Sequence, residues 1–171
     1  NHQHFVSGFV RSRNQHQGWQ WVDGLERANW SLMQICQLLM YLPFDDATWC
    51  RVTEWLSHSE WVYWQKVPVN PYQSNSDLLP AIDKLLDSDR PQAAIECLHY
   101  RLHNKLPLDR ERTVRAVLDA VSTKESAITI DTYHITELIK ALQNDPATDE
   151  NDLFNVEWAY LQLLDRLRDA E

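Results

Sequence analysis

Apolar residues recur along most of this chain at intervals of three and four positions. Three clear sets begin at Leu32, Val114 and Ile135, and each continues in the order i, i+3, i+4, i+7. This spacing places the side chains on one face of an α-helix, and that face must be buried against a neighbouring element. The pattern therefore predicts an all-α protein, with helices over residues 3–13, 17–28, 30–41, 46–56, 59–66, 76–87, 90–103, 110–122, 132–143 and 149–168.

Capping residues stand where this helical pattern is interrupted. Side-chain oxygens that can accept hydrogen bonds from free N–H groups precede four predicted helices, at Asp45, Asp109, Asp131 and Thr148. Ser57 and Glu60 have the spacing of a capping box, in which the hydroxyl and the carboxylate satisfy each other's free backbone N–H groups. Residues 127–130, Ala-Ile-Thr-Ile, have the composition of a β-strand. Four residues without a partner strand cannot form a sheet, so we expect an extended linker there.

A weak internal repeat runs through the middle of the chain. Residues 51–67 can be laid on residues 81–97, which aligns Val52 with Ile82, Trp55 with Leu85, Leu56 with Leu86, and Trp64 with Ala94. A period of about 30 residues per helix pair is the size of a helical solenoid repeat. We therefore expect antiparallel helix pairs stacked as an irregular α-solenoid. A compact orthogonal helical bundle with hairpins of similar length is the alternative.

The expected organisation has three parts. Residues 1–69 form an aromatic-rich helical subdomain, residues 70–75 a connection, and residues 76–171 the helix-pair repeats, continuous with the first part. The connection is the longest polar, proline-containing stretch, so we expect the internal hinge there. The chain begins at Asn1 without Met, and we expect it to be an excerpt of a longer protein.

Composition and charge exclude several classes of function. The three glycines lie within the first 24 residues, so glycine-rich loops for phosphates or dinucleotides cannot form from residue 25 onward. The formal charge of −9 argues against nucleic acid as a partner, because neutralising phosphates needs a basic surface. Apolar runs such as residues 38–42 are much shorter than the roughly 20 residues of a membrane helix.

The three cysteines also carry information. Cys36, Cys50 and Cys97 are odd in number and widely spaced, which makes neither a disulfide framework nor a zinc site. Each lies inside an apolar helical pattern, so we expect small buried hydrophobes in a reducing compartment. No signal peptide is visible at the start of the chain. These features place the protein in the cytoplasm.

Candidate catalytic and metal-binding residues are present but form no complete motif. His99 and His103 are four residues apart on one helix face, and Glu96 precedes His99 by three, the Glu-x-x-His spacing of di-iron bundles. The second such motif that a di-iron site needs is missing from the sequence. Cys97 and His99 are two residues apart and do not face each other on a helix. Beside His134, a capping role for Asp131 is the simpler interpretation. We expect no catalytic residue, no metal, no cofactor and no enzyme activity.

Aromatic residues concentrate in the N-terminal half, where seven of the eight tryptophans precede residue 65. In the run 61–64, Trp61, Tyr63 and Trp64 cannot all point inward from one helix. Exposed aromatic side chains carry much of the binding energy at protein interfaces. We therefore predict a contact surface at these three residues, for a protein partner or for an adjoining domain of the parent protein.

Several segments together resemble a helical-repeat region of large, multidomain bacterial proteins of uncharacterised function. The resemblance covers roughly residues 45 to 165, and its segments are residues 63–67, 81–86, 89–94, 132–135 and 156–161. The turn at residues 89–94 is also similar to the helix-pair turn of tetratricopeptide-like arrays. The resemblance carries no agreed catalytic residues. It implies a helical region of a longer polypeptide and a place in a defence or stress-response system.

Three functions are compatible with this sequence. The leading hypothesis is a non-catalytic helical scaffold or protein-interaction segment of a larger cytoplasmic protein. The second is an architectural spacer between domains, which should expose an apolar face at one end. The third is part of an enzyme or defence-system sensor whose active site lies in further sequence.

Overall fold

The computed structural model describes residues 2–122 and 131–168, with side chains from residue 5 onward. The described residues form nine α-helices and two short 3-10 turns and contain no strand, which confirms the all-α prediction. The linker predicted at residues 127–130 lies outside the described residues. The chain divides into two compact units, residues 1–77 and 78–171, each with its own buried residues.

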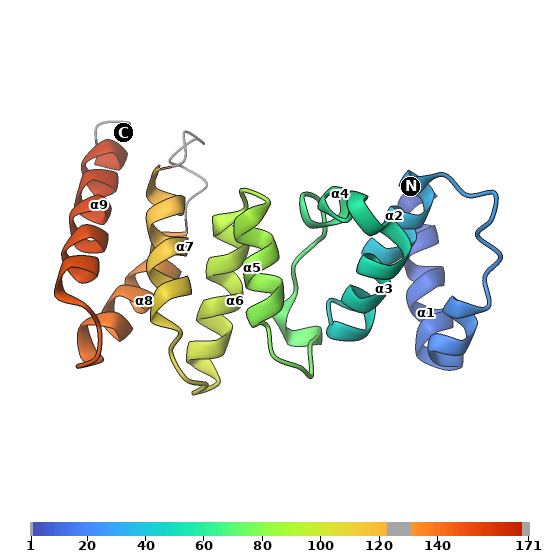
Figure 1. Ribbon diagram of the computed structural model, residues 1–171, viewed down its shortest axis with the longest axis horizontal. Coiled ribbons are helices and arrows are strands. Elements are labelled where there is room, and N and C mark those ends of the chain that lie inside the picture. Colours follow the sequence, from blue (N-terminus) through green and yellow to red (C-terminus); the bar gives the residue numbers. More distant parts are fainter. Residues whose placement is uncertain (1, 123–130, 169–171) are drawn as a thin grey trace. The chain divides into compact units, whose positions relative to one another are not determined.

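The N-terminal unit holds four helices and two 3-10 turns (Figure 1). These are α1 (His2–Asp23), α2 (Leu32–Tyr41), α3 (Asp46–Leu56), η1 (Ser57–Ser59), α4 (Trp61–Trp64) and η2 (Pro71–Gln73). Helix α2 packs against α1, α3 and α4. The unit is thus organised around α2.

The two helices predicted at residues 3–13 and 17–28 are one kinked helix, α1, which ends earlier than predicted. At Gly18 the backbone takes φ 66°, a conformation that glycine adopts readily, so the chain bends there without stopping. After Asp23, the Arg27 guanidinium donates to the carbonyl oxygens of Val22 (3.0 Å) and Leu25 (3.1 Å) and lies over the ring of Trp55. These contacts hold the segment as a turn, which helical periodicity alone does not reveal.

Helix starts in this unit confirm one predicted cap and correct another. Asp45 caps α3, since its Oδ1 accepts a hydrogen bond from the N–H of Thr48 at 3.0 Å. The capping box predicted at Ser57 and Glu60 is wrong. Ser57 has φ 49° and ends α3, while the Glu60 carboxylate accepts from the Thr53 hydroxyl at 3.0 Å. The unit's capping box begins α2 instead, at residues 31–34.

The predicted connection, residues 70–75, lies in the N-terminal unit and is tied to it. Its centre forms η2, and Pro71 is buried. The Gln73 side chain accepts a hydrogen bond from the backbone N–H of Phe44 at 2.9 Å, and Asn70 accepts one from the N–H of Tyr72 at 3.2 Å. The polar side chains of this segment therefore form the hydrogen bonds that anchor it.

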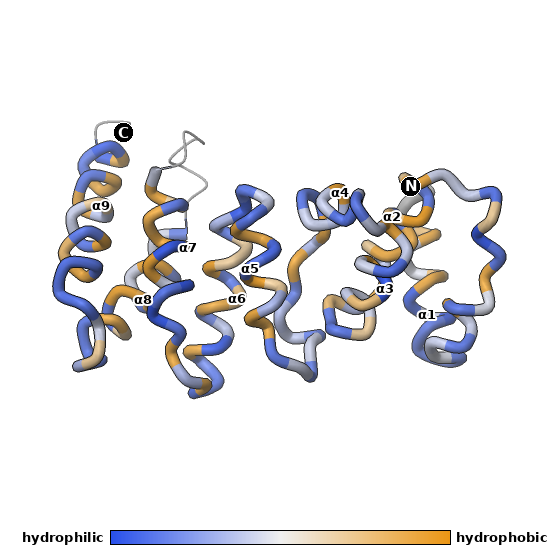
Figure 2. The backbone as a smooth tube through the Cα atoms, viewed as in Figure 1, coloured by the Kyte–Doolittle hydropathy of each residue, from blue (hydrophilic) through white to orange (hydrophobic). Residues whose placement is uncertain are grey.

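The C-terminal unit consists of five helices, α5 (Leu79–Asp87), α6 (Pro91–His103), α7 (Arg110–Ser122), α8 (Thr132–Asn144) and α9 (Glu150–Arg168). Helix α6 packs against α5, α7 and α8, and α7 packs against α5 and α9. Apolar segments return about once per turn along α7 and α9 (Figure 2), as the spacing predicts. The fully buried side chains include Ile82, Leu85, Ile95, Val117, Ile135, Leu138 and Leu163.

Polar side chains fix the starts of these helices. Asp109 and Asp131 act as predicted: their Oδ1 atoms accept from the N–H groups of Arg112 (3.0 Å) and His134 (3.1 Å). Thr148 does not cap α9, because its hydroxyl donates to the carbonyl of Leu142. Asp149 takes that role and accepts from the backbone N–H groups of residues 151 and 152.

Ion pairs join α5 to α7 on the surface of the unit. Arg112 donates to both carboxylate oxygens of Asp83 at 2.7 Å and to Asp109 at 2.8 Å. Arg115 reaches Asp87 at 2.9 Å. Hydrogen bonding to Asp83 raises the pKa of the Arg112 guanidinium. These pairs stabilise one register of α5 on α7.

In the described part of the chain, no helix combines the length and hydropathy needed to cross a membrane.

Candidate interaction site

The three predicted contact residues separate into one exposed and two buried side chains. Helix α4 is a single turn, and its Trp61 is 55% exposed. Tyr63 is fully buried and Trp64 nearly so, which places both in the core of the N-terminal unit. As their spacing predicts, the three do not all point inward. Only Trp61 offers a surface to a partner, so Tyr63 and Trp64 are removed from the predicted contact surface.

The buried aromatic residues form the support on which Trp61 stands. Trp64 packs at 5.1 Å from Tyr63, 6.1 Å from Trp49 and 6.5 Å from Phe44, measured between ring centroids. Phe44 and Trp49 are edge-to-face at 5.0 Å. Such pairs contribute about 0.5–1.5 kcal/mol each beyond the area they bury. They fix the position of the one-turn helix, whose own hydrogen bonds are too few to do so.

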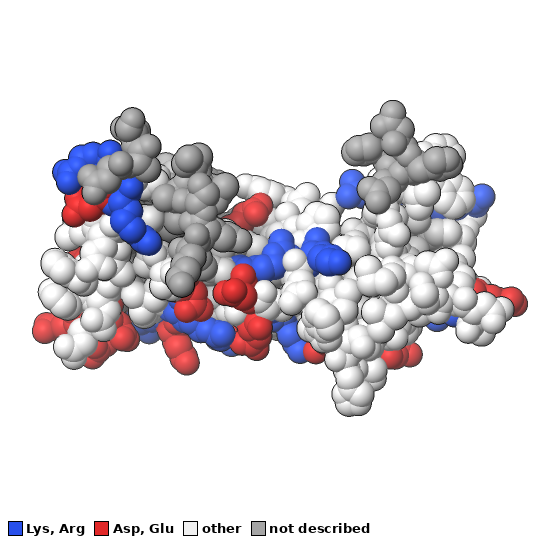
Figure 3. Space-filling model, turned by 90° about the horizontal axis from the view of Figure 1, so that it is seen from above, with Lys and Arg blue, Asp and Glu red and all other residues white. Residues whose placement is uncertain are grey.

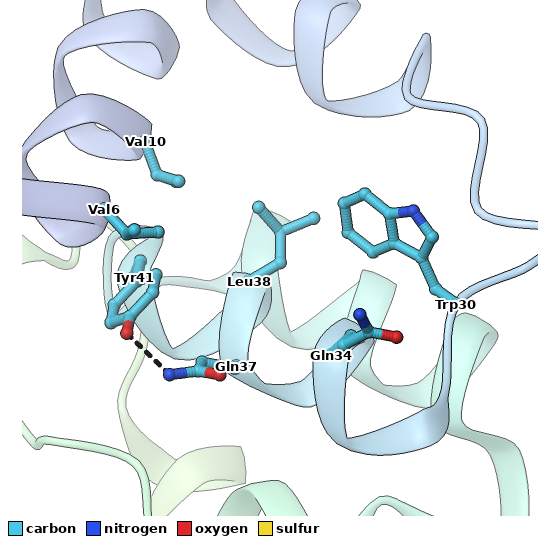
Figure 4. A pocket seen from close by; sticks show the side chains of 7 residues that line it. All are labelled: Val6, Val10, Trp30, Gln34, Gln37, Leu38 and Tyr41. Carbon is cyan, nitrogen blue, oxygen red and sulfur yellow. Dashed lines mark hydrogen bonds between the residues drawn. The ribbon is translucent and has the colours of Figure 1, made fainter. Parts of the chain in front are cut away.

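A groove lies between α1 and α2 in the same unit. One part of it encloses about 300 Å³. Figure 4 shows the seven side chains around this part: Val6 and Val10 from α1, Gln34, Gln37, Leu38 and Tyr41 from α2, and Trp30 from the segment before α2. The lining is apolar except at the edge, where the Gln37 side chain donates to the Tyr41 hydroxyl at 2.8 Å.

A second part of the groove carries positive charge. It encloses about 430 Å³ and shares Gln37 and Tyr41 with the first part, so the two are continuous. Arg11 of α1 and Lys66, which follows α4, line it, and both side chains are exposed. Among the described side chains, neither Arg11 nor Lys66 forms an ion pair. An apolar depression thus ends at two cations.

The two units differ in charge. Residues 1–77 hold five Lys and Arg against seven Asp and Glu, whereas residues 78–171 hold eleven against eighteen, so the formal charges are −2 and −7. On the face seen in Figure 3, acidic side chains gather mainly over the C-terminal unit, at the left. The groove therefore belongs to the less acidic part of the chain.

Histidines from two helices meet in the C-terminal unit. The rings of His99 (α6) and His134 (α8) stack at 4.0 Å between centroids, and His103 lies 6.4 Å from His99. The Nδ1 atom of His134 is 2.8 Å from Asp131. Burial and the two neighbouring imidazoles lower the pKa of His99, while burial raises the pKa of Glu96. The sequence pointed to His99 and His103, but only packing of α6 on α8 brings His134 to them.

This histidine cluster lacks the geometry of a metal centre. Within residues 2–122 and 131–168, no three His, Cys, Asp or Glu side chains are placed to hold a metal ion. Cys97 on the same helix is buried, and burial raises the pKa of its thiol. An activated nucleophilic thiol has a lowered pKa instead.

The cysteine prediction needs one correction. Cys36 and Cys97 are buried, as expected, but Cys50 is exposed. On α3 the core positions are taken by Trp49 and Val52, and Cys50 falls one residue past Trp49, on the outward side.

Helix α9 is apolar on two opposite faces, a feature that the sequence argument missed. Val156 and Leu163 are buried within the unit. Phe154, Trp158 and Leu161, spaced i, i+4, i+7, are 63%, 55% and 55% exposed. The sequence does contain this second set of apolar residues at helical spacing. It is hard to recognise there, because its members alternate along the chain with those of the buried set.

Comparisons with protein-family models, with curated proteins and with solved structures find no match to this chain. The resemblance drawn from the sequence therefore remains a prediction, and the function has to be argued from the side chains described above.

Proposed function

We propose that this chain is a non-catalytic helical scaffold whose N-terminal unit binds a protein partner. The observation that carries the proposal is the position of Trp61, an indole 55% exposed on a turn that buried aromatic rings hold in place. Trp is among the side chains enriched at the energetic centre of protein interfaces. It loses little conformational freedom on binding.

For the C-terminal unit we propose stacked helix pairs, as in an irregular α-solenoid. The support is the packing order, in which α7 lies against both α5 and α9 while α6 lies against α8. In such arrays each helix touches its neighbours in the chain and the equivalent helix of the next pair. The compact bundle is the alternative arrangement.

The interaction function is tested by replacing Trp61 and Trp64 separately with Ala. Trp61→Ala should weaken capture of a partner about tenfold or more and shift the melting temperature by less than about 4 °C, because the side chain is exposed. Trp64→Ala should cost about 3–5 kcal/mol of stability, because it leaves a cavity in the aromatic core. Capture is quantified from an extract of cells that make the protein, and stability by circular dichroism.

Tyr72→Ala is the matched control, since Tyr72 is another exposed aromatic side chain of the same unit. Equal loss of the captured partner in Tyr72→Ala and Trp61→Ala, or no loss in either, would remove Trp61 from the interface.

A second candidate function is the architectural spacer. It is favoured by the exposed stripe of Phe154, Trp158 and Leu161 on α9, which is the kind of apolar face that a spacer presents to a neighbouring domain. The same capture experiment separates the two functions. A spacer retains no partner above background in the unmodified chain.

A further inference from the structure

We propose that the groove between α1 and α2 binds an acidic amphipathic helix of the partner protein, with its apolar face in the apolar part and its carboxylates at Arg11 and Lys66. This inference rests on the proposed function, namely that the N-terminal unit binds a protein. It adds the site and the chemical class of the segment that is bound. Trp61 is not needed for it.

The apolar part of the groove suits side chains of a docked helix. Val6, Val10, Trp30 and Leu38 surround about 300 Å³, at the lower end of the range of about 300–1,000 Å³ found for ligand pockets. In Figure 4 these side chains converge on one space from α1, from α2 and from the segment before α2. An amphipathic helix that lies in a hydrophobic groove places residues i, i+3, i+4 and i+7 into such a space.

The polar edge of this part is already ordered. Gln34 is held by the capping box of α2, where its Oε1 accepts from the Ser31 N–H at 2.8 Å, and Gln37 is bonded to Tyr41. Side chains fixed before binding lose less entropy when a ligand arrives. The edge therefore limits the width of the groove without offering a charge to the apolar part.

The charges decide which helix fits. Arg11 and Lys66 line the second part of the groove from two segments 55 positions apart in the chain, and neither is neutralised by an ion pair among the described side chains. Unpaired cations at one end of an apolar groove attract carboxylates and repel a basic peptide, which sets the orientation of a bound segment. Two cations in a unit of formal charge −2 are too few for a nucleic-acid backbone.

The test uses two fluorescein-labelled synthetic helices of 16 residues. Both carry Leu and Phe on one face, and one carries four Glu near one end where the other carries four Lys. Fluorescence anisotropy with the full chain should show binding of the Glu peptide at micromolar concentration and at least tenfold weaker binding of the Lys peptide. Raising the salt concentration should narrow this difference, because exposed charges are screened.

Charge reversal in the groove should invert the preference. The double variant Arg11→Glu, Lys66→Glu should weaken binding of the Glu peptide at least tenfold and strengthen binding of the Lys peptide. Arg13→Glu is the matched control: Arg13 lies on the same helix, over the ring of Phe9, and outside the groove lining. It should change either affinity by less than threefold, and all variants should keep the helical circular dichroism of the parent.

Each outcome bears on the inference. Equal affinity for both peptides, or binding that the double variant leaves unchanged, would overturn it. Binding of dodecanoate is measured directly by titration calorimetry, and tight binding of this fatty acid without binding of the Glu peptide would likewise overturn it. Trp61→Ala should leave peptide affinity unchanged. If the groove fails while Trp61 still governs capture of a partner, the proposed function stands and only the groove assignment falls.

Discussion

The three thiols of this protein occupy two kinds of surroundings. Cys36 and Cys97 are fully buried, and burial raises the pKa of both. Cys50 is exposed on α3, where water and reagents reach it directly. A thiol reacts as its thiolate, so raised pKa and burial act together to protect the first two.

At the residue scale we predict that one thiol of the folded protein reacts rapidly with a maleimide or with an aromatic disulfide reagent. The other two should react at least about a hundredfold more slowly, because reagents reach them only after a local opening of the structure that costs several kcal/mol. Cys50→Ser should abolish the rapid phase and Cys36→Ser should leave it intact. Stopped-flow absorbance counts the thiols in each phase. Two rapidly reacting thiols in the native protein would contradict the assigned burial.

Single residues show where the sequence sufficed and where it did not. The spacing of Trp61, Tyr63 and Trp64 correctly predicts that they cannot share one face. It cannot say which side chain points outward, because the orientation depends on Phe44 and Trp49, which approach from other segments. The prediction that Cys50 is buried is wrong for the same reason. An apolar pattern fixes the period of a helix, but the direction of its buried face comes from the neighbour.

At the scale of elements, helix α6 meets helix α8 through titratable side chains. His99, His134, His103 and Tyr133 pack ring to ring, and Glu96, Asp131 and Glu137 act on them electrostatically. Burial opposes charge on His99 and on Glu96 alike. The contact between the two helices therefore depends on pH in two opposite ways.

We predict that acidification from pH 7.5 to 5.5 lowers the free energy of unfolding through His99. Its pKa is below 6.5 in the folded state, so the unfolded chain binds the proton first and is favoured as the pH falls through 6.5. Glu96 has the opposite sign, since its pKa is above 4.5 in the folded state and protonation favours folding there. His99→Gln should make the stability fall less steeply as the pH is lowered. Glu96→Gln should make it fall more steeply, because the substitution removes a group whose protonation favours the folded state.

Urea unfolding at a series of pH values measures how the free energy of unfolding of each variant changes with pH. His58→Gln, which replaces an exposed histidine of the N-terminal unit, is the control and should reproduce the parent's profile. If His99→Gln retains the full pH dependence, the acid sensitivity lies outside the contact of α6 with α8.

Helix limits were predicted well where the signal is local and poorly where it is not. Asp45, Asp109 and Asp131 cap the helices that follow them, because a cap is a contact within three residues. The end of α1 depends on Arg27 reaching Trp55, which is 28 positions away. That contact exists only after α1 and α3 have packed, and no local pattern contains it.

At the scale of the whole chain, the repeat of about 30 residues has a partial structural counterpart. Val52, Leu56 and Trp64 are buried, as are the residues aligned with them, while Trp55 is only half-buried opposite the buried Leu85. Ion pairs from α5 to α7 also span 28 and 29 positions. The repeat itself remains a prediction, since similar hairpin lengths also occur in bundles.

The groove could not be predicted from the sequence. Its lining comes from Val6, Val10, Trp30 and Leu38, which belong to segments up to 32 positions apart, and its cations come from residues 11 and 66. Each of these residues taken alone reads as an ordinary helix position. Only the kinked α1 resting on α2 brings them to one surface, so an interaction site of this kind becomes visible with the tertiary structure.

Two separate cores predict two separable unfolding transitions. Leu138 is fully buried in the C-terminal unit and Leu39 in the N-terminal unit, so replacing either with Ala should cost about 2–5 kcal/mol. For units of this size, each kcal/mol lowers the melting temperature by about 4–8 °C. Seven of the eight tryptophans lie in residues 1–77, so fluorescence reports mainly the N-terminal unit while circular dichroism reports helices of both.

Leu138→Ala should therefore move the part of the circular dichroism transition that comes from the C-terminal helices to lower temperature and leave the tryptophan transition in place. Leu39→Ala, the same substitution in the other core, should move the tryptophan transition. The difference between the two signals arises because each leucine supports only the side chains packed around it. Coincident shifts of both signals in both variants would show that the two cores unfold as one cooperative structure, and the division at residue 77 would then have no energetic meaning.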